Sequence, residues 1–298
     1  MVALLLAASI VCRPAAAQDR AVAWLHGGVV VRRDIPASAR PTPPPLLEID
    51  PATGATAQLP FLTNGRPVWS RDERAAVVEL VAPGAPQVRV LARDGTQIAV
   101  LRGASDPAWS ADGGRLAYFA FAQASVHVVD ADGTDDHLVG AGRLPSWSPD
   151  GTRLAVQDDG RIAVLDLTTG AEHRLVPGYV PLWSPRGDWI AYTRSDGRAA
   201  VVHPDGSGAH PLTRARAGDM ELAWSPDGAR LALALHFPGR DPTRLGLVTV
   251  ANLRLRLVAD GALPLWSPDG KQLAFTVSAA VRLVNATTLR VRDLVPRC

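Results

Sequence analysis

Short apolar runs alternate with turn residues along most of the chain. Typical runs are Leu222-Ala223 and Leu231-Ala232-Leu233, which flank a Trp-Ser-Pro-Asp-Gly segment. Runs of this length, bounded by Pro, Asp and Gly, are typical of β-strands joined by tight turns. No segment keeps an apolar period of 3.6 residues, so we expect very few helices. The pattern therefore predicts an all-β protein built from hairpins.

One of these hairpins recurs as a repeated phrase. It reads WSPDGARLALAL from Trp224, and close copies begin at Trp69, Trp109, Trp147, Trp183 and Trp266. Successive Trp residues lie about 40 residues apart, which is the period of a four-stranded propeller blade. Strand candidates between the copies, such as VHVVDADGTDDHLV from Val126, supply the third and fourth strands. The repeat therefore predicts a β-propeller of four-stranded blades.

Each part of the phrase has a structural role in reversing the chain. Pro226 fixes φ, the Asp227 side chain can accept backbone N–H bonds, and Gly228 tolerates a positive φ. We expect the Ser225 hydroxyl to cap the turn and the Trp to pack against the neighbouring unit. The motif is therefore interpreted as architectural, with no catalytic role for its Ser or Asp.

The segment from Ala21 to Pro60 lacks the phrase but is interpreted as a diverged copy. Trp24 takes the Trp position, and His26-Gly27-Gly28 supplies the reversal. The insertion IPASARPTPPP, from Ile35 to Pro45, lengthens this unit and favours an extended, semi-rigid loop. Seven blades result, and a six-bladed ring with an N-terminal extension is the alternative. Because an open stack would expose strand edges, we expect the first blade to close against the last.

Residues 1–17 are interpreted as a secretory signal peptide. An apolar core from Val2 to Cys12 precedes the small residues Ala15-Ala16-Ala17, which fits cleavage before Gln18. The core is too short for a permanent membrane span. Lipid attachment at Cys12 is the less favoured alternative. The prediction is a single propeller domain over residues 18–298, periplasmic or secreted, with no transmembrane segment.

The charge balance of the chain indicates which classes of partner to expect. The chain has 31 Lys and Arg against 29 Asp and Glu, a formal net charge of +2. No basic run is interleaved with aromatic residues, so no nucleic-acid partner is predicted. The 47% hydrophobic content is sufficient for one closed domain of this length.

The WSPDG phrase, with Leu-Ala-Phe after it in the copy from Trp266, occurs with its close variants in six copies at this period and resembles the propeller repeat of TolB. The same repeat is found in the propeller domains of prolyl-oligopeptidase-like enzymes. The resemblance covers nearly the whole chain after residue 17 and implies a WD40-like propeller, a periplasmic location and protein partners. The α/β domain that precedes the propeller in TolB and the hydrolase domain of the peptidases have no counterpart in this sequence. A role in the Tol system and peptidase activity are therefore not predicted.

Residues able to carry chemistry are scattered along the chain. No GxSxG or HExxH motif occurs, and the seven histidines stand singly. The group Asp130, Asp132, Asp135 and Asp136 is similar to a calcium loop but lacks the glutamate that closes an EF-hand. We interpret this group as a solvated turn. No catalytic, cofactor-binding or metal-binding residue is therefore predicted.

The candidate binding surface is the ring face on which the innermost strands begin, just before each Trp. Loops gather on such a face and vary while the scaffold stays fixed. We expect the polar residues at these positions to surround the central opening and to contact a protein partner or small ligand: Arg66, Asp106, Arg143, Tyr179 and Glu221.

The sequence favours an exported, non-enzymatic propeller that binds a protein or a ligand. The alternative is a hydrolase or lyase with a metal-assisted site at the central funnel. A convergent set of His, Asp or Glu on the innermost strands would indicate the enzyme. Those positions are mostly apolar, as in Pro67-Val68 and Pro264-Leu265, which favours the scaffold. A sensor domain whose partner lies on another chain is a third interpretation.

Overall fold

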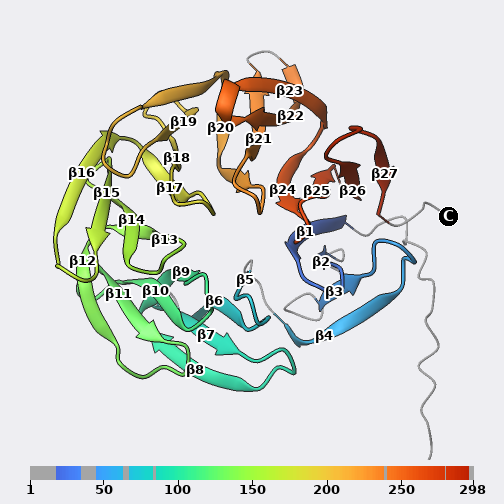
Figure 1. Ribbon diagram of the computed structural model, residues 1–298. Helices are drawn as coiled ribbons and strands as arrows, with labels where there is room; N and C mark the ends of the chain where they lie inside the picture. Colours follow the sequence, from blue (N-terminus) through green and yellow to red (C-terminus); the bar gives the residue numbers. More distant parts are fainter. Residues whose placement is uncertain are drawn as a thin grey trace, which may run out of the picture.

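A computed structural model describes residues 18–34, 45–62, 67–82, 85–237, 240–278 and 280–294. Within these ranges the chain forms antiparallel four-stranded blades that follow one another in sequence order around a central axis (Figure 1). The one helical element there is the short 3-10 helix η2 (Val250–Asn252), and no helix is long and apolar enough to cross a membrane. The predicted seven-bladed, all-β propeller is confirmed.

The first four blades each use four consecutive strands. Blade 1 consists of β1 (Gln18–Trp24), β2 (Val29–Asp34), β3 (Pro45–Ile49) and β4 (Thr56–Leu62). Blade 2 consists of β5 (Val68–Trp69), β6 (Ala75–Ala82), β7 (Ala85–Leu91) and β8 (Gln97–Arg102). Blade 3 consists of β9 (Ala104–Trp109), β10 (Arg115–Ala120), β11 (Ser125–Asp130) and β12 (His137–Ala141). Blade 4 consists of β13 (Arg143–Trp147), β14 (Arg153–Asp158), β15 (Arg161–Asp166) and β16 (Glu172–Pro177).

Blades 5 and 6 share one long strand, so that β17 to β23 form a continuous sheet. Blade 5 uses β17 (Tyr179–Trp183), β18 (Ile190–Thr193), β19 (Arg198–Val202) and the first part of β20 (His210–Trp224). Blade 6 uses the rest of β20, then β21 (Arg230–Phe237), β22 (Arg240–Thr249) and β23 (Arg254–Asp260). Blade 7 consists of β24 (Ala262–Trp266), β25 (Gln272–Val277), β26 (Ala280–Asn285) and β27 (Val291–Asp293).

The hydrophobic core lies between blades. Ala117 and Val128 of blade 3, for example, pack in one buried cluster with Trp147, Leu154 and Ala163 of blade 4. The repeated Trp also binds across the same interface, because its indole Nε1 donates to a backbone carbonyl of the preceding blade. Such bonds join Trp109 to Val68 at 3.1 Å, Trp147 to Ala108 at 2.9 Å, Trp224 to Leu182 at 3.0 Å and Trp266 to Ala223 at 3.0 Å. The expected packing of the Trp on a neighbouring unit is therefore found.

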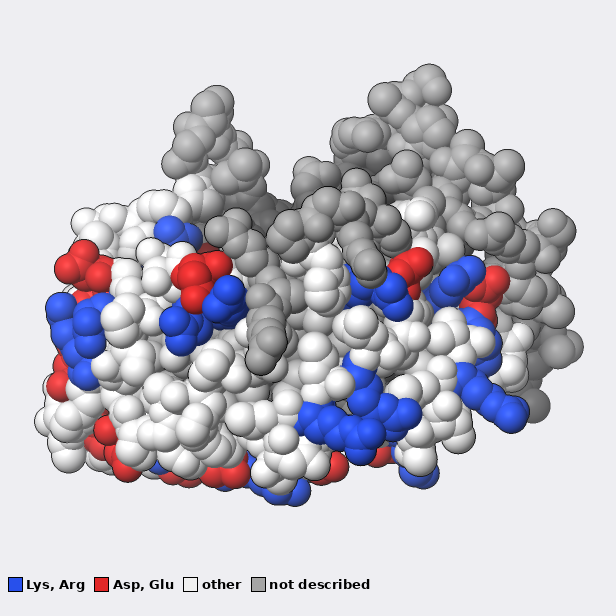
Figure 2. Space-filling view, turned by 90° about the horizontal axis from the view of Figure 1, so that it is seen from above, with Lys and Arg blue, Asp and Glu red and all other residues white. Residues whose placement is uncertain are grey.

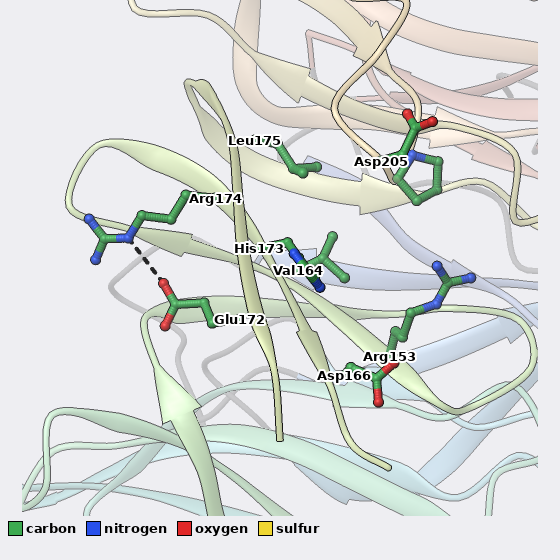
Figure 3. A pocket seen from close by; sticks show the side chains of 9 residues that line it. Arg153, Val164, Asp166, Glu172, His173, Arg174, Leu175 and Asp205 are labelled. Carbon is green, nitrogen blue, oxygen red and sulfur yellow. Dashed lines mark hydrogen bonds and ion pairs between the residues drawn. The ribbon is translucent and has the colours of Figure 1, made fainter. Parts of the chain in front are cut away.

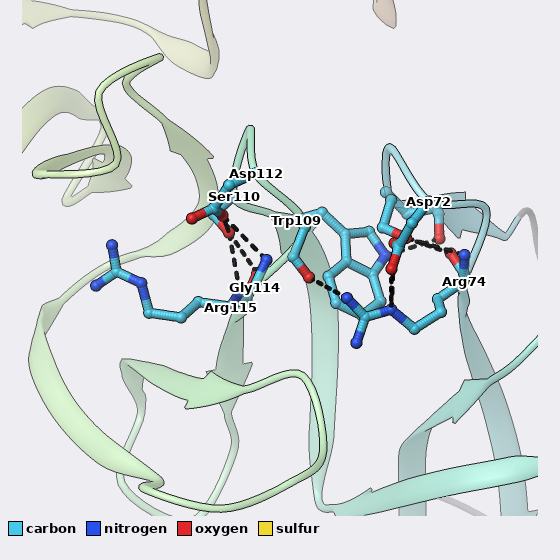
Figure 4. A network of polar contacts seen from close by, with 10 residues as sticks. Asp72, Arg74, Trp109, Ser110, Asp112, Gly114 and Arg115 are labelled. Carbon is cyan, nitrogen blue, oxygen red and sulfur yellow. Dashed lines mark hydrogen bonds and ion pairs between the residues drawn. The ribbon is translucent and has the colours of Figure 1, made fainter.

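The turn of the repeat is held by a small polar network (Figure 4). The Ser110 hydroxyl donates to Asp112 Oδ1 at 2.6 Å and accepts from the Arg115 backbone N–H at 2.9 Å. Asp112 Oδ1 also accepts from the Gly114 N–H at 3.0 Å. Because every polar atom named here is used to fix the reversal, the geometry supports the architectural interpretation of the motif.

The ring closes by packing of blade 1 on blade 7, and the described strands of these two blades are not exchanged. Ala21 and Val31 share a buried cluster with Ala274 and Leu283. The Ala21 N–H also donates to Thr276 Oγ1 at 3.2 Å. On the outer part of the same interface, Arg292 Nη2 donates to the Pro51 carbonyl at 2.6 Å. The proposed signal segment and most of the proline-rich insertion lie outside the described residues.

The innermost strands share a backbone irregularity that the sequence does not predict. Four of the described residues that precede a proline adopt a positive φ: Asp106 (52°), Leu144 (51°), Val180 (53°) and Leu263 (55°). The antiparallel register shifts at or near each of these positions, as it does at a β-bulge. A residue before proline is normally extended, so tertiary packing imposes this conformation.

Candidate functional site

A central channel of about 840 Å³ runs between the innermost strands. Its described wall is largely apolar and repeats from blade to blade, since several blades contribute the residues just before their Trp and the Trp itself. The repeating part of the wall comprises Pro67, Pro107, Pro145 and Pro181 with Trp69, Trp109, Trp147 and Trp183. An apolar cavity with few polar groups is the usual form of a ligand site.

Asp106 is the one acidic residue among the described residues that line this channel. It lies three residues before Trp109, where the equivalent bulged positions hold Leu144, Val180 and Leu263. Its side chain is 18% exposed, and its Oδ2 atom is buried and makes no hydrogen bond. The repeat therefore places a carboxylate at a position that is apolar in three other blades.

Arg143 supplies the charge that faces this carboxylate. It begins β13, and its Nη2 lies 3.4 Å from Asp106 Oδ2. The Arg143 side chain is 54% exposed, and its guanidinium also lies 5.9 Å from the centre of the Phe119 ring. Because the two charged groups are 3.4 Å apart and about half of the Arg143 side chain is exposed, its remaining N–H groups are open to an anionic ligand.

Two exposed aromatic side chains lie on the same face as this pair. Phe121 follows β10 and contacts Phe119 edge-to-face, with ring centres 5.0 Å apart. Tyr179 begins the next innermost strand, β17, and is also exposed. Sequence reasoning missed Phe121, because its exposure depends on the β10–β11 loop rather than on any motif. Aromatic faces next to a cation suit a ligand that contains rings and negative charge.

The structure brings some of the site residues predicted from the sequence together and does not describe others. The structure brings Asp106 and Arg143 together and places Tyr179 at the start of the neighbouring innermost strand. Arg66 lies outside the described residues, and Glu221 lies in β20 with its side chain undescribed. By their distance from Trp69 and Trp224, both occupy the repeat position of Asp106.

Metal-binding geometry is missing from the part of the chain that the structure describes. No three His, Cys, Asp or Glu side chains converge there so as to hold an ion. In the acidic turn of blade 3, Asp132 accepts from the Thr134 N–H at 2.9 Å. Asp136 accepts from the Tyr118 hydroxyl at 2.7 Å, and burial together with this bond raises the pKa of Tyr118. These carboxylates therefore serve the protein's own hydrogen bonds.

A second cavity, of about 510 Å³, lies between blades 4 and 5 (Figure 3). Most of its charged side chains already have hydrogen-bond or ion-pair partners within the protein. Arg174 pairs with Glu172 at 3.0 Å and with Asp158 at 2.5 Å. Asp166 accepts from the Thr168 hydroxyl at 2.6 Å, and Asp205 accepts from the Ser207 hydroxyl at 2.7 Å. The central channel, where the Asp106 Oδ2 atom makes no hydrogen bond, is therefore the better candidate site.

No protein-family model and no curated protein matches the chain. Its structure is similar to an oligogalacturonate lyase in complex with manganese, with a TM-score of 0.65 and 14% identity over 83% of this chain and 82% of that one. It is similar to an uncharacterised protein from Listeria monocytogenes, with a TM-score of 0.67 and 11% identity over 98% of both chains. TolB from Acinetobacter baumannii matches with a TM-score of 0.56 and 16% identity over 92% of this chain and 77% of that one.

These comparisons correct the expected function. The sequence favoured a non-enzymatic scaffold, but oligogalacturonate lyases, which are enzymes, are among the structures of this fold that match. The scaffold interpretation is therefore corrected, because these matches support the enzyme alternative better. The matches include enzymes as well as TolB. At these identities they show the fold alone, which is the TolB-type β-propeller that the repeat predicts.

Proposed function

We propose that the chain is a hydrolase or lyase whose substrate binds in the central channel. The observation that carries this proposal is Asp106, the one acidic residue in the largely apolar described wall, with a buried oxygen that makes no hydrogen bond and lies 3.4 Å from Arg143. A strained backbone holds it there, with φ at 52° immediately before Pro107. The same positive φ occurs at Leu144, Val180 and Leu263, so a bulge shared by the repeat sets the place of this carboxylate.

In this proposal Asp106 acts as the general base. The Asp106 carboxylate, whose buried Oδ2 atom faces Arg143, accepts a proton either from a substrate carbon in an elimination or from an attacking water in a hydrolysis. Arg143, 3.4 Å from the same oxygen, binds the negative charge of the substrate and stabilises the charge that develops on it. The cation and the base thus act on neighbouring atoms of one substrate.

The side chains on the ring face that holds Asp106 and Arg143 indicate the class of substrate. Arg143 suits a carboxylate or phosphate, and the exposed rings of Phe121 and Tyr179 suit a molecule with flat or ring-shaped faces. An acidic oligosaccharide has both properties, and the similarity to an oligogalacturonate lyase is consistent with this class. We therefore take acidic oligosaccharides as the first substrates to test.

The metal-assisted form of the enzyme does not fit the described residues. The matched lyase structure contains manganese. The described wall of this channel supplies one carboxylate, whereas manganese in proteins is held by several oxygen or nitrogen ligands. No step of the proposed mechanism therefore passes through a metal.

We also propose that the chain acts outside the cytoplasm, with its mature form beginning at Gln18. The apolar segment before Ala15-Ala16-Ala17 supports this location. Expression of the full chain with a C-terminal tag, followed by cell fractionation and N-terminal sequencing, tests it. A tagged chain that stays in the cytoplasm with its first residues intact would contradict export.

The enzyme proposal is tested by incubating the purified chain with acidic oligosaccharides. Absorbance of unsaturated products reports elimination, and new reducing ends without that absorbance report hydrolysis. We expect Asp106→Asn to lower the rate by about 100-fold or more. The control is Asp196→Asn, which removes a partly exposed carboxylate paired with Arg194 in blade 5.

The two variants must both keep the wild-type melting temperature for the comparison to count. Equal losses in Asp106→Asn and Asp196→Asn would contradict the assigned base. If the wild-type protein neither binds nor converts any of the neutral and acidic oligosaccharides, the proposed function is wrong.

A further inference from the structure

β23 is the outermost strand of blade 6, and one of its edges has no partner among the described strands. It pairs with β22 on its inner edge only, from Arg254 opposite Thr249 to Asp260 opposite Arg244. The backbone N–H and C=O groups that point away from β22 are therefore available to another strand. A strand of this length with a free edge is a site at which an extended segment can add.

The side chains of β23 alternate in chemical character. Arg254 and Arg256 share one face of the strand, while Leu255 and Leu257 share the other. Leu255 is partly buried against the core of blades 5 and 6, but Leu257 is 44% exposed. Leu253, just before the strand, is 39% exposed. One side of the free edge is thus basic and the other is apolar.

The two arginines have no acidic partner among the described residues. Asp260, at the end of the same strand, is bound to Arg244 at 2.9 Å. By contrast, Arg174 on the equivalent strand of blade 4 is paired with two carboxylates. Figure 2, which views the ring from the side on which blade 6 lies, shows a group of basic side chains on this rim. The positive charge of β23 is therefore left for a partner.

We propose that β23 binds an acidic, extended segment of another protein by antiparallel strand addition. Acidic side chains of the incoming strand face Arg254 and Arg256, and its apolar side chains cover Leu255 and Leu257. A second copy of β23 is a poor occupant, because antiparallel pairing of two such strands sets arginine against arginine. Alternating acidic and apolar residues are the pattern that complements this edge. The interaction is independent of the channel and of its activity.

The test uses a fluorescently labelled, end-capped peptide of alternating Glu and Val. The purified full chain is added, and the fluorescence anisotropy of the peptide reports binding. The paired variant is Arg254→Glu with Arg256→Glu. The matched control is Arg102→Glu, which changes an exposed arginine at the end of β8, the outermost strand of blade 2. A second peptide carries N-methyl groups on the amides of one edge, which keeps its charge and removes strand pairing.

We expect the acidic peptide to bind and the paired variant to weaken binding by at least about tenfold, with added salt also weakening it. Arg102→Glu should leave binding within about twofold of wild type, as expected for a charge on a distant blade. The N-methylated peptide should not bind. Equal binding of the methylated peptide, or equal loss in Arg102→Glu, would overturn strand addition at β23. Binding of anionic phosphatidylserine vesicles in place of the peptide, lost in the paired variant, would assign the edge to a membrane surface and overturn the proposal.

Discussion

The guanidinium of Arg115 lies 4.8 Å from the centre of the Trp147 indole ring in the next blade. Its Nη2 also donates to the carbonyl of Gly151, in the turn that follows that Trp, at 2.6 Å. The same arrangement joins Arg74 to Trp109 and Gly113, and Arg230 to Trp266 and Gly270. A single side chain thus binds both the ring and the turn of the neighbouring repeat.

Replacing Arg115 by Ala should therefore weaken the contact between blades 3 and 4. Loss of a cation–π contact and a charged hydrogen bond is expected to lower the free energy of unfolding by about 1–3 kcal/mol. The change is measured from urea denaturation curves. Arg102→Ala, at an exposed site without an ion pair to any described residue, should change it by less than about 0.5 kcal/mol. Equal effects of the two substitutions would contradict the role of Arg115.

The buried serine of the repeat should contribute about as much to the free energy of unfolding as Arg115 does. The Ser225 hydroxyl donates to Asp227 Oδ1 at 2.5 Å and accepts from the Arg230 N–H at 2.9 Å. Ser225→Ala leaves that N–H without this acceptor, so we expect a loss of about 1–3 kcal/mol. Thermal unfolding against Ser207→Ala, at an exposed turn, checks it. A smaller effect at Ser225 than at Ser207 would be inconsistent with a capping role.

Much of the fold could be predicted because the repeat is a local structure. The turn residues, the flanking apolar strands and the period all lie within about 40 residues of sequence. Even the diverged first blade is recognisable, since Trp24 ends β1 and the turn that follows it leads into β2. The continuous strand β20 was not predicted, because nothing local marks where one blade ends and the next begins.

The site could be predicted only in part. The start of each innermost strand located Asp106 and Arg143, but their 3.4 Å contact joins two blades and depends on how the ring packs. The positive φ at Asp106 and Leu144 opposes the local preference of a residue before proline. The channel geometry is therefore a property of the closed ring, which a reading of single repeats does not contain.

Acid should destabilise the propeller through its turns. The Ser225 hydroxyl and the Ala229 N–H lower the pKa of Asp227, and the equivalent serine lowers that of Asp112, Asp150 and Asp269. Because the folded-state pKa lies below the unfolded value of 3.8, the unfolded chain binds protons first as pH falls. The stability from these carboxylates is therefore complete above the unfolded pKa and is lost as pH falls through the folded-state pKa.

Urea midpoints recorded from about pH 7 to about pH 3 check this dependence. We expect little change down to about pH 5 and a steep fall below about pH 4. Asp227→Asn should be less stable near neutral pH but should lose less stability in acid, because one of the titrating carboxylates is gone. A main loss between about pH 7 and pH 6 would instead indicate histidine titration.

Glu73 occupies the turn position that glycine holds in the other copies, and its φ is 62°. Its carboxylate accepts from the His26 N–H at 3.0 Å and pairs with Arg93, which in turn binds the buried Glu48 at 2.5 Å. Glu73→Ala removes these bonds and keeps the unfavourable φ, whereas Glu73→Gly removes the bonds and relieves it. We expect Ala to be less stable than Gly by about 1 kcal/mol, by chemical denaturation. Gly113→Ala, in the next blade, should cost at least as much, because its Cβ would also lie 3.1 Å from Asp72 Oδ1. Equal stability of the two Glu73 variants would show that the backbone there is unstrained.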